Sequence, residues 1–316
     1  MCRWHCGRQI KLTDEISKSS VGPKIIAGLN KEIAMDTSLR TVHGKTYFTA
    51  EWGKPGSQTI LGIHGLTANC CHMAVIAEFL AGGGRHVLAY DVRGRGDSSP
   101  AENPSTLRRH AQDAVEIIST LPAERVLILG YSMGAYIGSI AAGLSDKAAG
   151  LVLFDGGGMP DKAGAIKLAP ALARLDKIFA RAEDYVEAAK PGYAALGLPW
   201  NEYIEAAVRH EIGLGQDGRY KYKGEAERVK EDLLDIGQFK HQDVFARIKC
   251  PVLLVHAQGG MGQGGPLFGE SAYDITRKCL PDLTFYQTRA NHYTMMLERQ
   301  PEMNREVEAF VSGCGF

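Results

Sequence analysis

The sequence predicts an α/β protein in which a parallel β-sheet is covered by helices on both faces and carries a mainly helical insertion. Short apolar runs rich in β-branched residues alternate with helical patterns through most of the 316 residues. The alternation stops between residues 158 and 239, where only helical patterns occur, and then resumes. Hydrophobic residues make up 45% of the chain and charged residues 23%, as in ordinary globular proteins.

The elements before the interruption follow one another regularly. Two apolar segments joined by His43-Gly44-Lys45 predict an antiparallel hairpin at the sheet edge, because a turn this short joins neighbouring antiparallel strands. The hairpin strands are Leu39–Val42 and Thr46–Trp52, the later strands are Thr59–Ile63, Val87–Tyr90, Val126–Leu129 and Gly150–Phe154, and the helices between them are Cys71–Leu80, Thr106–Thr120 and Met133–Leu144.

The interruption divides the chain. We expect an N-terminal extension over residues 1–36, a core made of residues 37–157 and 240–316, and a helical insertion over residues 158–239. The helices predicted in the insertion are Ala163–Leu175, Ala182–Ala189, Asn201–Ile212 and Gly224–Asp235. After it, the core resumes with the strands Val252–His256 and Leu283–Thr288 and the helices Ser271–Cys279 and Pro301–Val311.

Charge and cysteine usage indicate a cytoplasmic protein without a nucleic-acid or membrane partner. Lysine and arginine number 36, as do aspartate and glutamate, so no net field attracts polyanions. The first twelve residues lack the apolar run of a signal peptide, and the longest apolar runs fall far short of the roughly 20 residues that span a bilayer. Seven scattered cysteines favour reduced thiols. A metal site at Cys2, His5 and Cys6 is only a weak alternative, because four ligands would be needed and no second Cys/His cluster follows.

The strongest catalytic signal is Gly130-Tyr131-Ser132-Met133-Gly134, a GxSxG sequence between a predicted strand and a predicted helix. Because the bare pattern arises easily in a glycine-rich chain, the evidence lies in the strand-turn-helix context. A serine on such a sharp turn needs glycines two residues away on either side, since side chains there would collide with neighbouring backbone. The alternative is a serine that only caps the helix.

Two further groups complete the chemistry that a nucleophilic serine requires. Backbone N–H groups must stabilise an oxyanion, and we expect them from Met133, the residue after the serine, and from Leu66 in the loop after the third strand. A general base is expected late in the chain, after the last strand. His292 has that position, whereas the other histidines fit it less well.

Taken together, these segments resemble the α/β-hydrolase superfamily from about Leu39 to Val311. The resemblance rests on the hairpin, the His64-Gly65 loop, the Asp91–Ser98 turn, the serine turn and the late histidine. It implies an eight-stranded, mostly parallel sheet, a Ser-acid-His triad, and an active site between the sheet and a helical cap. It also implies that the Asp91–Ser98 turn is structural, with Arg93 holding the loop by hydrogen bonds.

The acid departs from the commonest pattern of that superfamily. The loop after Val252–His256, where the acid usually lies, contains no carboxylate, and the first one downstream is Glu270. Asp155 instead follows the strand next to the serine's strand, a second location that some members use. A histidine base needs an acceptor at its other ring nitrogen. We therefore expect Asp155 to be the acid and keep Glu270 as the alternative.

These residues predict a serine hydrolase that cleaves an ester, lactone or thioester of a small apolar molecule through an acyl-enzyme on Ser132. No cofactor and no metal is expected, and the partner is a small acyl substrate, with a homodimer left open. Carbon–carbon bond hydrolysis and acyl transfer by the same triad remain alternatives. A non-catalytic ligand-binding or biosynthetic protein on this fold is a third hypothesis.

Overall fold

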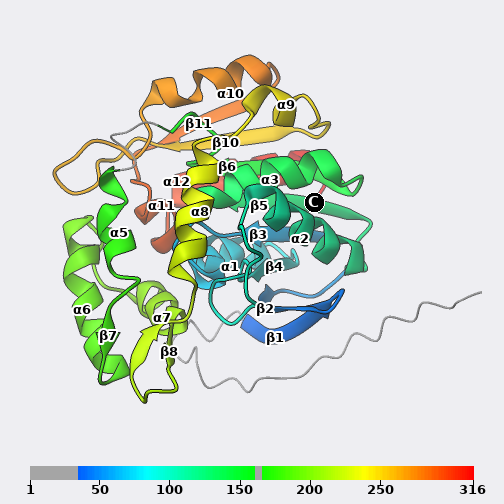
Figure 1. Cartoon of the computed structure of the whole chain (residues 1–316). Coiled ribbons are helices and arrows are strands. Elements are labelled where there is room, and N and C mark those ends of the chain that lie inside the picture. Colours follow the sequence, from blue (N-terminus) through cyan, green and yellow to red (C-terminus); the bar gives the residue numbers. More distant parts are fainter. Residues whose placement is uncertain (1–34, 161–165) are drawn as a thin grey trace, which may run out of the picture.

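The computed structural model describes residues 35–160 and 166–316, and its centre is one eight-stranded sheet (Figure 1). The strand order is β1-β2-β4-β3-β5-β6-β10-β11. β1 and β4 pair antiparallel with β2, and every other pairing is parallel. The predicted eight-stranded, mostly parallel α/β fold is therefore confirmed. The strands are β1 (Met35–Val42), β2 (Lys45–Trp52), β3 (Gln58–Ile63), β4 (Val87–Tyr90), β5 (Arg125–Tyr131), β6 (Ala148–Phe154), β10 (Val252–Ala257) and β11 (Thr284–Thr288).

Helices cover both faces of this sheet, so its central strands are apolar on both sides. Successive residues of β5 show this, because their side chains point to opposite faces. Val126 and Ile128 belong to the apolar cluster on one face, and Leu127 and Leu129 belong to the apolar cluster on the other face. One face carries α2 (Leu107–Thr120) and α3 (Met133–Leu144), and the other carries α1 (Ala74–Gly82) and α12 (Pro301–Gly313).

Smaller helices join these elements near the carboxyl ends of the strands. A 3-10 turn, η1 (Cys70–Met73), precedes α1, and Asn69 caps it by accepting a hydrogen bond from the Cys71 N–H. The late segments are α9 (His241–Phe245), η2 (Glu270–Tyr273), α10 (Asp274–Cys279) and α11 (Thr294–Leu297).

We call the segment between β6 and α9 the insertion. Most of it lies to one side of the sheet, whereas its last helix crosses in front of the core (Figure 1) and buries Val229 and Ile236 in it. Its helices are α5 (Ala169–Ala173), α6 (Ala182–Ala195), α7 (Glu202–Glu211) and α8 (Ala226–Ile236), and it also contains a three-stranded sheet of β7 (Ile178–Phe179), β8 (Ile212–Leu214) and β9 (Tyr220–Tyr222).

The insertion differs from the sequence prediction in two ways. The small sheet was not expected, because its strands have two or three residues and only Ile212 and Tyr222 among them are buried, which leaves no periodic signal. Helix α6 continues through Pro191, where a break was expected. Of the predicted helix Ala163–Leu175, residues 163–165 lie outside the described residues.

Candidate active site

Ser132 occupies the sharp turn between β5 and α3. Its φ of 54° and ψ of −116° are unusual for a residue with a side chain, and such strain is typical of a nucleophile turn. The flanking glycines explain how the turn fits. A Cβ atom on Gly130 would lie 2.6 Å from Ala135 Cα, and one on Gly134 would collide with the carbonyl oxygens that end β3. Glycine at these two positions therefore allows β3, β5 and α3 to approach one another.

Asp155 and His292 meet at the neighbouring strand ends. Asp155 follows β6 directly with a φ of 42°, and His292 lies between β11 and α11. His292 Nδ1 and Asp155 Oδ2 are 2.7 Å apart, and both side chains are buried. This is a short, charge-assisted hydrogen bond in which the ring N–H donates to the carboxylate. The Asp155 contact leaves the other ring nitrogen, Nε2, available to the cavity.

The second oxygen of Asp155 is also fully engaged. Oδ1 accepts hydrogen bonds from the Ala257 N–H at 3.1 Å and from the Tyr273 hydroxyl at 2.9 Å. Burial, and next the charge of Asp155, raise the pKa of Tyr273 well above its ordinary value, so this tyrosine stays protonated and donates. The end of β10, after which the usual acid is missing, thus supplies the Ala257 N–H to Asp155, the acid expected after the neighbouring strand β6. Sequence reasoning missed Tyr273, since its only signal was its nearness to Glu270.

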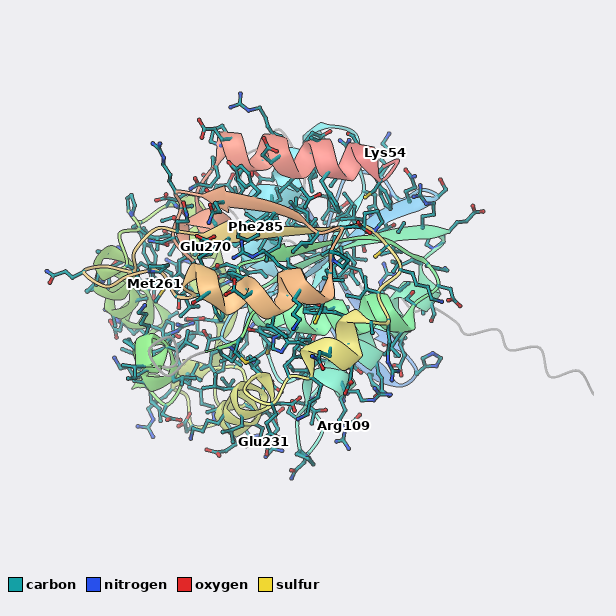
Figure 2. All side chains as sticks on the ribbon, turned by 90° about the horizontal axis from the view of Figure 1, so that it is seen from above. Lys54, Arg109, Glu231, Met261, Glu270 and Phe285 are labelled. Atoms are coloured by element: carbon teal, nitrogen blue, oxygen red, sulfur yellow. The ribbon has the colours of Figure 1, made fainter. Side chains whose placement is uncertain are left out.

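Glu270, the alternative acid, does not reach the histidine. It begins η2 on the outside of the molecule (Figure 2), where its side chain is 56% exposed and lies 3.4 Å from Arg277. The structure thus brings Asp155 to His292 and leaves Glu270 in solvent.

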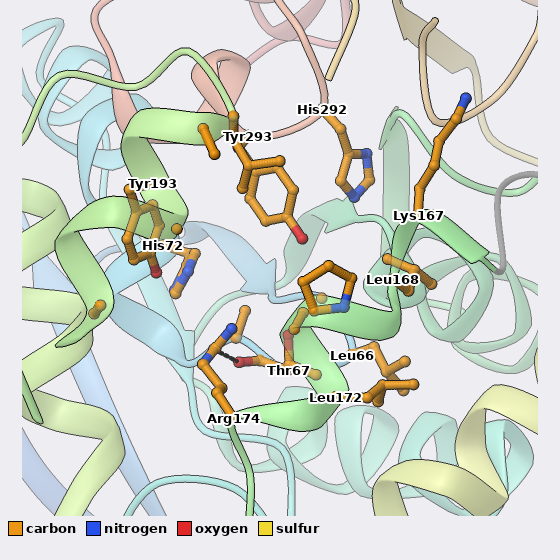
Figure 3. A pocket seen from close by; sticks show the side chains of 18 of the residues that line it. Leu66, Thr67, His72, Lys167, Leu168, Leu172, Arg174, Tyr193, His292 and Tyr293 are labelled. Carbon is orange, nitrogen blue, oxygen red and sulfur yellow. Dashed lines mark hydrogen bonds between the residues drawn. The ribbon is translucent and has the colours of Figure 1, made fainter. Parts of the chain in front are cut away.

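Ser132 and His292 line one cavity (Figure 3). Tyr131, next to the serine, donates its hydroxyl proton to the His292 backbone carbonyl at 3.0 Å, and its ring lies 5.0 Å from the imidazole. No hydrogen bond joins the Ser132 hydroxyl to His292 within residues 35–160 and 166–316. Such bonds are often long before substrate binds, so this geometry is compatible with proton transfer.

Leu66, one of the two expected oxyanion donors, lines this cavity, and Met133, the other, directly follows Ser132 at the start of α3. The N–H groups of Leu66 and Met133 have no hydrogen-bond partner in the described part of the chain, and Met133 begins α3, whose N-terminus favours negative charge. His64 stabilises the Leu66 loop: it accepts from the Val92 N–H at 2.9 Å, so its other nitrogen donates to Gly65 O at 2.8 Å. Burial lowers the pKa of His64 to about 4, which keeps it neutral.

Arg95 connects the Leu66 loop to the insertion. Its Nε donates to Leu66 O at 2.9 Å, and its Nη2 donates to Asp232 of α8. Both side chains are inaccessible to solvent, and His110 Nε2 lies 3.1 Å from the same carboxylate. Arg93, which the resemblance gave the task of holding the Asp91–Ser98 turn by hydrogen bonds, donates to Asp113 and Glu102. The sequence singled out Arg93 and gave no signal for Arg95.

Cys70, Asp91 and His210 bring potential metal-ligand atoms within 4.8 Å of one another. The Asp91 oxygens, however, already accept from the N–H groups of Cys70 and Asp97 and from His210 Nε2 at 2.7 Å. Burial alone would lower the pKa of His210, but the Asp91 carboxylate outweighs burial and raises it to about 9. A protonated imidazole does not ligate a metal. This cluster is better described as an ion pair between the core and α7.

The cavity has a volume of about 360 Å³ and lies between the strand ends and the insertion. Leu66 and Tyr131 are among the lining residues from the core, whereas the insertion contributes most of the wall, in part through α5 and α6. The lining is largely apolar, and a cavity of this kind accepts a small molecule and excludes most of the solvent. The cysteine and histidine residues near the N-terminus, at positions 2, 5 and 6, lie outside the described residues.

The family model for the alpha/beta hydrolase family matches residues 60–304, which is more than half of the chain. The chain belongs to the alpha/beta hydrolase family. This hydrolase has no match among curated protein sequences. None of its helices in the described residues is long and apolar enough to cross a membrane.

Three solved structures show how widely this hydrolase shares its fold. E-2-(acetamidomethylene)succinate hydrolase has a TM-score of 0.75 at 18% identity, over 88% of this chain and 100% of that one. The thioesterase domain from the curacin biosynthetic pathway has a TM-score of 0.69 at 19% identity, over 87% and 99%. N-formylmaleamic acid deformylase from Pseudomonas putida S16 has a TM-score of 0.64 at 21% identity, over 86% and 100%. At these identities the likeness concerns the fold alone.

Proposed function

We propose that this hydrolase cleaves an ester, lactone or thioester of a small, largely apolar acyl group through an acyl-enzyme on Ser132. One observation carries the proposal: the imidazole of His292 is held by Asp155 at 2.7 Å and lines the same cavity as a serine on a strained strand-helix turn.

In the proposed mechanism, Ser132 Oγ attacks the substrate's acyl carbon while His292 Nε2 takes the serine proton. Asp155 keeps the other imidazole proton on Nδ1 and stabilises the imidazolium that forms. The N–H groups of Leu66 and Met133 donate to the oxyanion of the tetrahedral intermediate. His292 then gives its proton to the leaving group, and the acyl group remains on Ser132. A water molecule that His292 deprotonates releases the acid and restores the serine.

The apolar cavity supports a small acyl substrate. Action in the cytoplasm is supported by five free thiols, those of Cys70, Cys71, Cys250, Cys279 and Cys314. Among the similar structures, one is named a thioesterase and one a deformylase, which is compatible with acyl chemistry here. Carbon–carbon bond hydrolysis and acyl transfer would use the same three residues. No specific contact favours them over hydrolysis.

Labelling with a fluorophosphonate tests the nucleophile. This probe phosphonylates an activated serine, and we expect one label per folded chain on the peptide that contains Ser132. Ser132→Ala should abolish labelling, while Ser145→Ala, at the other end of α3, should leave it unchanged. Folded wild-type protein that takes no label, and that hydrolyses none of a series of 4-nitrophenyl esters, would support the non-catalytic ligand-binding hypothesis instead.

A further inference from the structure

One part of the cavity wall carries three hydrogen-bond donors that the proposed reaction does not use. Arg174, directly after α5, lines the cavity with His72 of η1 and Tyr193 of α6. Figure 3 shows these three side chains on one side of the opening and His292 on the other. No aspartate or glutamate lines the cavity in the parts of the chain that the structure describes.

Arg174 is fixed in place by Glu211 and Thr67, and one of its nitrogens, Nη1, keeps its protons free. Its Nε and Nη2 donate to the carboxylate of Glu211 at 3.2 and 2.8 Å, and Nη2 also donates to Thr67 O at 3.1 Å. Nη1 has no hydrogen-bond partner among residues 35–160 and 166–316. Glu211 is saturated, because it also accepts from the Tyr185 hydroxyl at 2.6 Å. The guanidinium is therefore preorganised next to the Leu66 loop, with donor capacity left for a ligand.

The two neighbouring groups also donate. His72 Nδ1 accepts from the Asn69 N–H at 3.4 Å, so the ring proton lies on Nε2. Burial first, and then the charges of His64 and Arg174, lower the pKa of His72 to about 3, so the ring is neutral and cannot act as a cation. The Tyr193 hydroxyl has no protein partner in the described residues, and burial raises its pKa above the ordinary range, so it stays protonated. Three groups that can donate, with no carboxylate in the described lining, suit an anion.

We propose that Arg174, His72 and Tyr193 bind a free carboxylate at the far end of the acyl chain, which makes monoesters or monothioesters of dicarboxylic acids the substrate class. A planar carboxylate can accept from a guanidinium edge and from neighbouring O–H and N–H groups at once. Two lysines also line the cavity, Lys167 and the exposed Lys177, and their positive charges favour the entry of an anion. This inference rests on the proposed function, since it deepens the substrate class of the same site.

The test compares two esters that differ only in the terminal group: mono-4-nitrophenyl adipate, which ends in a carboxylate, and 4-nitrophenyl hexanoate, which ends in a methyl group. We expect kcat/KM for the adipate ester to exceed that for the hexanoate ester about tenfold or more, since hydrogen bonds to a charged group are the strong ones. The preference should fall with added sodium chloride. Equal values at low salt would overturn the proposal.

Two variants and one control assign the preference to these residues. Tyr193→Phe removes only a hydroxyl, and Arg174→Lys keeps the charge while losing the planar edge. Each should reduce the ratio of the two kcat/KM values several-fold. Tyr286→Phe, on the edge strand β11, is the matched control and should leave the ratio unchanged. If both variants fold and keep the wild-type ratio, the carboxylate is not bound there.

The outcomes separate this inference from the proposed function. Hydrolysis of both esters with equal kcat/KM, abolished by Ser132→Ala, would leave the proposed function intact and remove only the carboxylate site. Hydrolysis of neither ester, together with absence of fluorophosphonate labelling, would remove both.

Discussion

The core and the insertion contribute different things to the same cavity. Ser132, Asp155 and His292 lie at the ends of the adjacent strands β5 and β6 and in the loop after β11, where pairing with neighbouring strands fixes the backbone. The insertion contributes walls and two donors, Arg174 directly after α5 and Tyr193 on α6. Under the proposed function, the core would carry the reaction and the insertion would contribute most to the choice of substrate. Variants in each region test this division.

The largest effect is expected from Asp155→Asn in the core. An amide would leave the His292 tautomer unfixed and the imidazolium unsupported, so kcat should fall about 10⁴-fold with little change in KM. Steady-state kinetics on 4-nitrophenyl hexanoate measure this loss, and circular dichroism checks that the variant is folded.

Glu270→Gln is the matched control for that change, because Glu270 is a carboxylate on the exposed η2. It should retain wild-type turnover. Loss of turnover in Glu270→Gln with retention in Asp155→Asn would exchange the two assignments.

The next largest effect is expected where the two regions are joined by Arg95 and Asp232. Asp232→Asn would leave the Arg95 guanidinium buried without a counter-charge, and should lower the free energy of unfolding by about 3 kcal/mol or more. Because Arg95 also donates to Leu66 O, kcat should fall as well. Urea unfolding and kinetics measure both. Glu227→Gln, on the exposed face of α8, is the control and should change neither quantity. If Asp232→Asn also left stability and kcat unchanged, this pair would not hold the Leu66 loop.

The contact between Asp91 and His210 gives a smaller, pH-dependent effect. Because the folded pKa of His210, about 9, lies above its ordinary value, the stabilisation is complete below about pH 6.5 and is lost as the pH rises through 9. About 3 kcal/mol of unfolding free energy should disappear over that interval. Asp97 also faces this pair, 3.8 Å from His210 Nδ1, and Lys223 in turn contacts Asp97.

Urea unfolding at pH 6 and pH 9.5, in the wild type and in His210→Gln, isolates the contribution of this histidine. The variant should be less stable at pH 6 and should show a much smaller fall between the two values. An equal fall in both proteins would assign the pH dependence to other groups.

The sequence predicted the sheet and the serine turn well, because each follows from local signals. Buried parallel strands are short continuous apolar runs, and the turn around Ser132 needs glycines at fixed spacing. Asp155 was found by position, as the first carboxylate after the strand next to the serine's strand. The structure brings Asp155 and His292 into hydrogen-bond contact and places Ser132 and His292 on one cavity.

The contacts between distant segments could not be predicted in this way. Tyr273 reaches Asp155 across 118 residues, Arg95 reaches Asp232 across 137, and Arg174 reaches Thr67 across 107. No spacing rule connects such pairs, because they depend on how the insertion packs on the core. The small sheet of the insertion escaped prediction for a related reason: its strands are too short to show a period.

The central claim, that Ser132 carries an acyl-enzyme, is tested most directly with 4-nitrophenyl trimethylacetate, whose bulky acyl group leaves an enzyme slowly. The account expects a burst of one 4-nitrophenolate per chain, and mass spectrometry of the quenched, digested protein should find the trimethylacetyl group on the peptide that contains Ser132. Hydrolysis that persists in Ser132→Ala, or an acyl group on any other residue, would contradict it.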